Sequence, residues 1–151
     1  MRSKLLIVAL ISIIAGACNK NQYTTKPQLK FIGANSYTFV QGQVMEFNLE
    51  FTDKEGDIQN NIYIEEITND KLCADNNFKS LYPLPSNFPQ QKNSKGNIIV
   101  RYIYGQVDGQ YPDYPGPKCG RNDTCVFRFA LTDLANNTSD TITTPQIVFI
   151  K

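Results

Sequence analysis

Apolar and polar residues alternate in two long segments of this sequence. In residues 44–51 every second side chain is apolar, and in residues 125–133 the same spacing recurs. A period of two places the apolar side chains on one face of a β-strand and the others on the opposite face. We therefore predict two long, half-buried strands, whose core-facing residues are Met45, Phe47, Leu49 and Phe51 in the first and Phe127, Phe129 and Leu131 in the second.

Shorter segments rich in β-branched and aromatic residues predict further strands. No segment of helical length shows a 3.6-residue period. About seven strands joined by turn-like links predict an all-β domain over residues 27–151, built from two antiparallel sheets packed face to face. The additional predicted strands are residues 28–32, 37–40, 62–67, 97–104 and 146–150.

Two links between the predicted strands are too long for hairpins. Residues 68–95 and 105–123 carry six of the eight prolines, and the second link also carries Tyr111 and Tyr114. The first link is either a functional loop or an ordered excursion across a sheet face. Its apolar side chains, such as Leu84 and Phe88, favour packing onto the domain.

The N-terminus has the features of a secretory signal. Arg2 and Lys4 precede an apolar stretch at residues 5–17, which is 13 residues long. A membrane-spanning helix needs about 20 residues, so residues 1–17 are predicted to be a cleaved signal peptide. This signal could belong to a lipoprotein. The alternatives are a plain secretory signal and an anchor that is retained.

The end of this stretch, Ala15-Gly16-Ala17-Cys18, resembles the lipobox of bacterial lipoproteins, with Ala15 where Leu is usual. This resemblance implies that Cys18 becomes the lipidated first residue and that residues 18–26 form a polar tether. The high Asn content (15 residues) and the segments 51–58 and 138–142 resemble lipoproteins from Bacteroidota. The resemblance implies outer-membrane anchoring, and the scarcity of acidic residues after Cys18 favours the periplasm over surface export.

The order of the predicted strands resembles an immunoglobulin-like sandwich of such lipoproteins. The segment 131–137 is similar to the D-x-x-G-N turn of these domains, with Ala135 and Asn136 in place of Gly and Asn. Asp140-Thr141-Ile142 also resembles the O-glycosylation motif of that bacterial group. Thr141 is therefore a candidate modification site, and the alternative is an ordinary strand start.

Composition excludes several classes of function. The chain has no His, so His-dependent catalytic triads, His-ligated metal sites and haem bound through His are excluded. Removing residues 1–17 leaves 13 basic and 14 acidic residues, a formal charge of −1. A nearly neutral domain is not expected to bind nucleic acid. Any attachment to a membrane is expected to come from acyl chains and not from charge.

Three cysteines remain after Cys18 is assigned to lipid. Cys119 and Cys125 are separated by five turn-forming residues, so we favour a local disulfide between them. A Cys73–Cys119 disulfide joining the two long links is the alternative, because connectivity cannot be deduced from spacing. A three-Cys metal site is disfavoured, since the chain lacks Cys-x-x-Cys spacing.

Acidic residues after the first long strand form a candidate calcium site. Asp53, Glu55 and Asp57 alternate around Gly56, and Asp133 follows the penultimate strand at the same predicted end of the sandwich. Hard oxygen ligands suit Ca²⁺, although the spacing is not that of an EF-hand. The alternative is that these residues cap turns through their own side chains.

The tyrosines of the second long link are candidate ligand contacts. Tyr111 and Tyr114, if exposed, could stack on a sugar ring or anchor a protein partner. If buried, they would pack the core instead. No nucleophile–base pair or phosphate loop supports catalysis, so we expect a non-enzymatic binding or assembly role toward an envelope protein. The alternative is a carbohydrate-binding module that uses these tyrosines, with or without Ca²⁺, and no other cofactor is expected.

Overall fold

The computed structural model describes residues 23–68, 70–73, 78–106, 109–117 and 119–151. The predicted signal peptide and Cys18 lie outside these residues. Within them, no helix is long and apolar enough to cross a membrane. The strands are β1 (Gln28–Ala34), β2 (Thr38–Val40), β3 (Val44–Asp53), β4 (Asn61–Thr68), β5 (Lys79–Pro83), β6 (Ser94–Tyr104), β7 (Asp113–Tyr114), β8 (Asp123–Thr132), β9 (Ile142–Thr143) and β10 (Ile147–Ile150).

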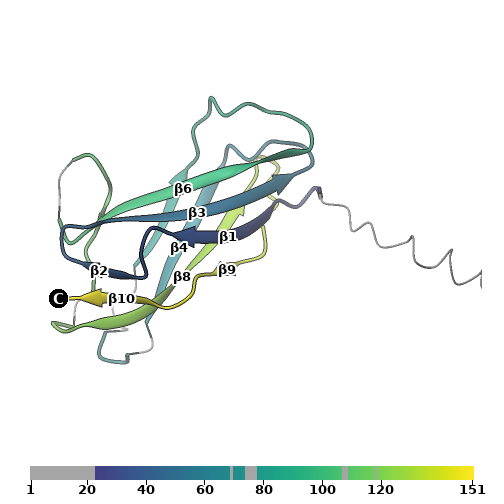
Figure 1. Ribbon diagram of the computed structural model, residues 1–151. Helices are drawn as coiled ribbons and strands as arrows, with labels where there is room; N and C mark the ends of the chain where they lie inside the picture. The colour runs from purple at the N-terminus through teal and green to yellow at the C-terminus, as the bar shows by residue number, and fades with distance from the viewer. Residues whose placement is uncertain (1–22, 69, 74–77, 107–108, 118) are drawn as a thin grey trace, which may run out of the picture.

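These strands form two stacked sheets, visible as two layers in Figure 1. The β3 sheet has the order β1-β3-β6-β7, and the β8 sheet has the order β2-β10-β8-β4-β5, with β9 paired to β8. All seven predicted strands are present. The arrangement confirms an all-β sandwich of two sheets, and the first two strands, β1 and β2, lie in different sheets.

Two pairings are parallel, whereas the sequence predicted antiparallel sheets. β2 runs parallel to β10, and β7 runs parallel to β6. Both lie at sheet edges. β2 follows β1 after the chain has crossed from one sheet to the other, so it meets the last strand of the domain and runs in the same direction. The longer pairings, β3 with β6 and β4 with β8, are antiparallel as expected.

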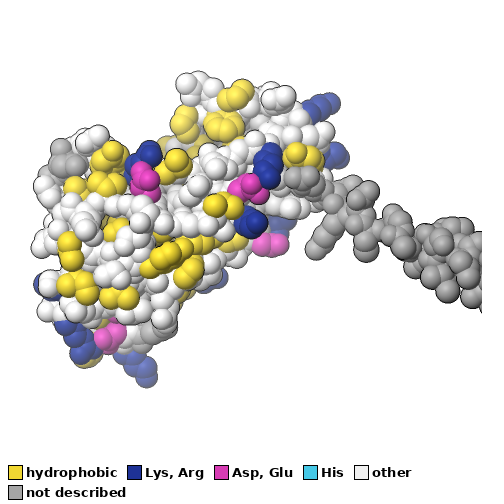
Figure 2. Space-filling model, viewed as in Figure 1, with side chains coloured by type: hydrophobic (Ala, Val, Ile, Leu, Met, Phe, Trp, Pro, Cys, Tyr) yellow, Lys and Arg dark blue, Asp and Glu magenta, His cyan; other side chains and the backbone are white. Residues whose placement is uncertain are grey.

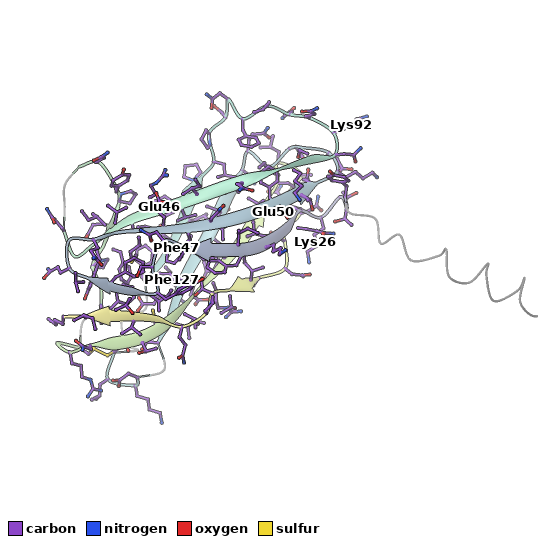
Figure 3. All side chains as sticks on the ribbon, in the orientation of Figure 1. Lys26, Glu46, Phe47, Glu50, Lys92 and Phe127 are labelled. Atoms are coloured by element: carbon purple, nitrogen blue, oxygen red, sulfur yellow. A yellow bond between two sulfur atoms is a disulfide. The ribbon has the colours of Figure 1, made fainter. Side chains whose placement is uncertain are left out.

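The core lies between the sheets and consists of the alternating residues that the sequence predicted. Met45, Phe47 and Leu49 of β3 are 0% exposed. Phe47 meets Phe127 and Phe129 of β8, with ring centroids 5.0 and 5.5 Å apart. Figure 3 shows Phe47 and Phe127 facing each other between the two layers. Burial of large aromatic side chains from both sheets is the main force that holds the layers together.

The outer faces carry cross-strand ion pairs. On the β3 sheet, Glu46 pairs with Arg101, and Lys95 lies 2.9 Å from Glu50. Figure 2 shows acidic and basic side chains next to each other on this face, with apolar groups between them. Exposed pairs of this kind contribute little stability, typically about 0–1 kcal/mol each. They do fix which face of each strand meets water.

The first long link is an ordered excursion rather than an open loop. Its middle forms β5, which pairs with β4 in register from Lys79 to Pro83. Residues 84–93 then carry the chain from the β8 sheet to the start of β6 in the β3 sheet. Several of the link's apolar side chains are partly buried against the core, namely Phe78, Tyr82, Leu84 and Phe88.

The described N-terminal residues contact one end of the sandwich, and the disulfide lies at the other. At the end where the described chain begins, the Lys54 amide donates to Thr24 O at 3.2 Å, and Lys26 Nζ lies 2.6 Å from Asp140 Oδ1. We call this the tethered end; Lys26 and Lys92 both lie there in Figure 3. The opposite end carries the disulfide described below, and we call it the disulfide end.

Candidate functional site

The disulfide joins Cys73 to Cys119, so the favoured Cys119–Cys125 pairing is wrong. The Cα atoms of Cys73 and Cys119 are 4.8 Å apart, and the bond connects the two long links. Cys125 cannot reach Cys119 because the alternation of β8 turns its side chain into the core, where it is 1% exposed. Burial raises the pKa of the Cys125 thiol, and the nearby carboxylates of Glu66 and Asp123 add to this effect. Cys125 is therefore an inert, protonated thiol.

Tyr114 is a core residue and not a ligand contact. It is 0% exposed, and its ring centroid lies 4.9 Å from that of Phe149 and 5.5 Å from that of Phe127. Its burial follows from β7, which pairs with the end of β6 and turns this side chain inward. Tyr111 is only partly exposed. The predicted pair of exposed tyrosines is thus not formed.

Three of the four predicted calcium ligands do meet at the tethered end. Oxygens of Asp53, Asp57 and Asp133 lie within 4.8 Å of one another, and we call these residues the carboxylate cluster. Asp53 ends β3, and Asp133 follows directly after β8. Both strands end at the same side of the sandwich, which brings residues 80 positions apart in the sequence together. Glu55 is exposed and interacts with Thr25 and Lys54 instead.

The alternative of turn capping also holds for two members of the cluster. Asp53 Oδ2 accepts hydrogen bonds from the amides of Gly56 and Asp57, at 2.5 and 3.3 Å. Asp133 accepts from the Asn137 amide at 2.7 Å and from its side chain at 2.9 Å. These bonds organise the loops, but they leave Oδ1 of Asp53 and Oδ1 of Asp57 buried and without a partner among the described residues.

The turn after β8 supplies its left-handed residue at Asn136, with φ 65°. In the D-x-x-G-N turn that this segment resembles, the glycine corresponds to Ala135. Asn tolerates this conformation better than most residues that carry a side chain, so the turn forms without glycine.

The electrostatics of Asp53 reflect its burial. Burial raises the pKa of Asp53, the two amide hydrogen bonds lower it, and the neighbouring Asp57 and Glu55 raise it again, with a net upward shift. The ion pairs at this end of the domain, Lys26–Asp140 and Lys54–Glu55, involve other carboxylates. Among the described residues, no member of the cluster forms an ion pair with a basic group.

A second acidic group lies inside the disulfide end, and sequence reasoning missed it. Glu66 is 4% exposed and Asp123 is 5% exposed. Glu66 exchanges hydrogen bonds with Phe78, donating its amide at 2.8 Å and accepting at Oε2 at 3.4 Å. Burial raises the pKa of Glu66, with Asp123 adding to the rise. The missed signal was the period of β4, which places Glu66 on the same face as Ile62 and Ile64.

An apolar groove runs between β5 and β6, at the side where the two sheets are open to each other. It has a volume of about 170 Å³. Pro112, from the second long link, is one of the lining residues. The other lining side chains come from β4, from β5 and the residue that follows it, and from β6, namely Ile62, Ile64, Tyr82, Leu84 and residues 98–102.

Beside this groove, most of β6 has no neighbouring strand on its outer side among the residues that the structure describes. β7 pairs only with Ile103 and Tyr104. The Ile103 amide points toward β7, since it donates to Pro112 O at 3.0 Å. Because β6 pairs with β3 without a register shift, the amides of Arg101 and Ile99 point the same way. We call residues 97–101 the β6 edge.

The remaining predicted sites are placed as follows. Thr141 is exposed and directly precedes β9, an arrangement compatible both with modification and with an ordinary strand start. Cys18 lies outside the described residues.

Comparison with known proteins adds only distant structural likeness. No protein-family model and no curated protein matches this sequence. Among solved structures, the chain is similar to the sporulation control protein Spo0M from Bacillus subtilis, with a TM-score of 0.46 and 9% identity. The match covers 85% of this chain and 51% of that one, so the chain spans about half the length of Spo0M.

Proposed function

We propose that this protein is a lipid-anchored domain of the bacterial cell envelope, facing the periplasm, which binds an extended segment of a partner protein and catalyses no reaction. The observation that carries the binding role is the β6 edge beside the apolar groove. An exposed strand edge can take up an extended peptide as an additional strand.

The β6 edge offers both backbone and side-chain contacts to such a segment. The outward amides and carbonyls of Ile99 and Arg101 are positioned to pair with a strand, and the Ile99 side chain is 48% exposed. On the other side of the groove, Tyr82 of β5 and Leu84 supply apolar side chains. Natural sheets usually shield a long edge, so an open edge beside apolar side chains favours a binding role.

The groove determines the chemistry of the proposed partner. Its apolar lining suits an aliphatic or aromatic side chain of the incoming strand, while the strand's backbone pairs with β6. Successive side chains of a strand alternate between its two faces. We therefore expect a partner segment with apolar residues at every second position and no proline at the paired residues.

The anchor is supported by the N-terminal sequence and by the position of the described N-terminal residues. Thr24 and Lys26 contact loops at the tethered end, so an anchor at Cys18 would hold this end nearest the membrane. The β6 edge lies along the side of the domain and would remain open to a partner.

The non-catalytic role is supported by the burial of Asp53 and Glu66, the carboxylates whose pKa is raised. Glu66 is 4% exposed, so a substrate could reach its carboxylate only after local opening of the domain. The carbohydrate-binding alternative required Tyr111 and Tyr114 to form an exposed aromatic platform. Tyr114 is buried in the core and cannot take part in one.

Site-specific photocrosslinking in native membranes tests the binding role. A photoreactive residue in place of Leu84, which lines the groove, is expected to crosslink to a partner peptide with apolar residues at alternate positions. The matched control replaces Val40, which is 44% exposed on β2, at another sheet edge. Equal crosslinking from both positions, or crosslinking to a second copy of this chain, would contradict the proposal.

A proline variant separates docking from folding. Ile99→Pro removes an amide that points away from β3, so the β3–β6 ladder is retained while a docking donor is lost. We expect crosslinking from position 84 to be abolished and the thermal unfolding midpoint to change by only a few degrees. Undiminished crosslinking in this variant would exclude the β6 edge.

The anchor is tested by the intact mass of the protein purified from native membranes. A mass equal to residues 18–151 plus acyl chains is expected. A mass without acylation would contradict the anchor and leave the proposed binding site untouched. An added hexose series would identify glycosylation, and Thr141→Ala would test its position.

A further inference from the structure

The carboxylate cluster has the dimensions of a single cation site. Oxygens of Asp53, Asp57 and Asp133 lie within 4.8 Å of one another. Ca²⁺ binds oxygen ligands at 2.3–2.6 Å, so two ligands of one ion lie no more than about 5 Å apart. The three carboxylates can therefore bind one ion together without a large rearrangement of their loops.

Two oxygens of the cluster have no hydrogen-bond partner among the described residues. Asp53 is 0% exposed, and its Oδ1 accepts no hydrogen bond, although its Oδ2 accepts two. Oδ1 of Asp57 is likewise buried and unpartnered. Native proteins rarely leave buried polar atoms without a partner. Two orphaned acceptors in a group of three carboxylates indicate a positively charged partner.

The donor set indicates which cation this is. The cluster offers only oxygen atoms, and the chain has no His. Oxygen-only sites favour hard cations over zinc or copper, and Ca²⁺ accepts carboxylates, backbone carbonyls and water in flexible geometry. We propose that Asp53, Asp57 and Asp133 bind one Ca²⁺ ion, which joins the loop after β3 to the loop after β8.

The neighbouring contacts show what such an ion would stabilise. The Leu134 amide donates to Asp57 O at 2.8 Å, which links the two loops directly. Gly56 packs so closely on Gln91 that a Cβ at position 56 would lie 2.0 Å from Gln91 O. The Asn93 amide donates to Lys54 O at 2.8 Å. Bound Ca²⁺ would therefore hold three segments of the tethered end in one arrangement, independently of the β6 edge.

Calorimetric titration and thermal unfolding of the full-length protein test this site. CaCl₂ is expected to bind with one ion per chain and to raise the unfolding midpoint relative to EGTA. At one hundred times Kd, the rise is expected to be about 10 °C for a domain of this size. Failure to detect binding, or an equal midpoint in Ca²⁺ and EGTA, would overturn the proposal, as would equal stabilisation by Mg²⁺.

Two amide variants provide the matched comparison. Asp57→Asn removes one charge from a carboxylate whose Oδ1 has no partner. In EGTA it is expected to unfold at or above the wild-type temperature, because repulsion within the cluster is relieved. In Ca²⁺ it is expected to unfold below wild type. A merely structural role for Asp57 would not reverse the order.

Glu55→Gln removes a charge from the same loop but outside the cluster, and it is expected to retain the full response to Ca²⁺. Loss of the response in Glu55→Gln, or its retention in Asp57→Asn, would contradict the assignment. Asp133→Asn is a second test, and its expected result is the same loss of Ca²⁺ binding.

Discussion

Phe47 of β3 and Phe127 of β8 pack against each other across the interior, with ring centroids 5.0 Å apart. Phe127 also contacts Tyr114 and Phe149. This pair therefore connects the two sheets at the centre of the aromatic core.

Truncation of Phe127 tests the importance of this contact. Phe127→Ala is expected to lower the free energy of unfolding by about 3–5 kcal/mol, because it loses buried area and leaves a cavity. Leu72→Ala is the control, since Leu72 is 74% exposed, and a change within about 0.5 kcal/mol is expected. A double-mutant cycle of Phe47→Leu and Phe127→Leu should give a coupling of about 0.5–1.5 kcal/mol. Denaturant unfolding measures both quantities.

The disulfide connectivity is checked by peptide mapping without reduction. A crosslinked peptide that contains Cys73 and Cys119 is expected, with Cys125 protected from alkylation until the protein unfolds. The bond spans a sequence separation of 46 residues, and its removal in Cys73→Ser/Cys119→Ser is expected to cost about 2–4 kcal/mol. The control Cys125→Ala should keep the crosslinked peptide. Detection of a Cys119–Cys125 peptide would contradict the structure.

Glu66 should make the protein less stable as the pH rises. Its pKa is raised on folding, so the folded state holds its proton more tightly than the unfolded state. The resulting stabilisation is complete below the unfolded value of 4.5 and is lost as the pH rises through the folded value. Glu66 is packed among Asp123 and Cys125 of β8, Tyr114 of β7 and Tyr104 of β6.

Glu66→Gln is therefore expected to flatten the pH dependence above pH 4.5 and to exceed the wild type in stability at pH 8. Urea unfolding at pH 5 and pH 8 measures the difference. The control is Glu65→Gln, whose carboxylate lies on the outer face and pairs with Lys79 at 2.8 Å. If both variants change the pH dependence equally, the buried environment of Glu66 is not its cause.

Gly56 is expected to resist substitution more strongly than a glycine of the same conformation elsewhere. Gly56 and Gly109 have φ values of 75° and 77°. A Cβ at Gly109 meets nothing within 4 Å, whereas one at Gly56 meets the backbone of Gln91. Gly109→Ala should therefore cost only the backbone strain, about 1–2 kcal/mol. Gly56→Ala should cost roughly 1–3 kcal/mol more, and chemical denaturation compares the two. Equal costs would contradict this prediction and would show that the backbone around Gln91 can move to make room for a Cβ at position 56.

The strands and most of the core were predictable from local pattern. Period-two alternation in β3 and β8 identifies Phe47 and Phe127 as core residues, because a strand in a two-layer domain can bury only one face. All three proposed calcium ligands were among the four candidates that the sequence indicated on the same basis. Strand ends predict which loops share one end of a sandwich, so Asp133 could be placed beside Asp53 and Asp57.

Tertiary structure decided what depends on pairs of distant residues. Spacing along the chain favoured Cys125 as the partner of Cys119, but the orientation of β8 buries Cys125 and the course of the two links brings Cys73 to Cys119. Tyr114 looked like a loop residue until pairing of β7 with β6 turned it inward. Glu55 alternates with Asp53 and Asp57, yet it faces water. In each case local sequence determines the residue type and period, whereas the packing of other segments determines which side chains are buried and which of them meet.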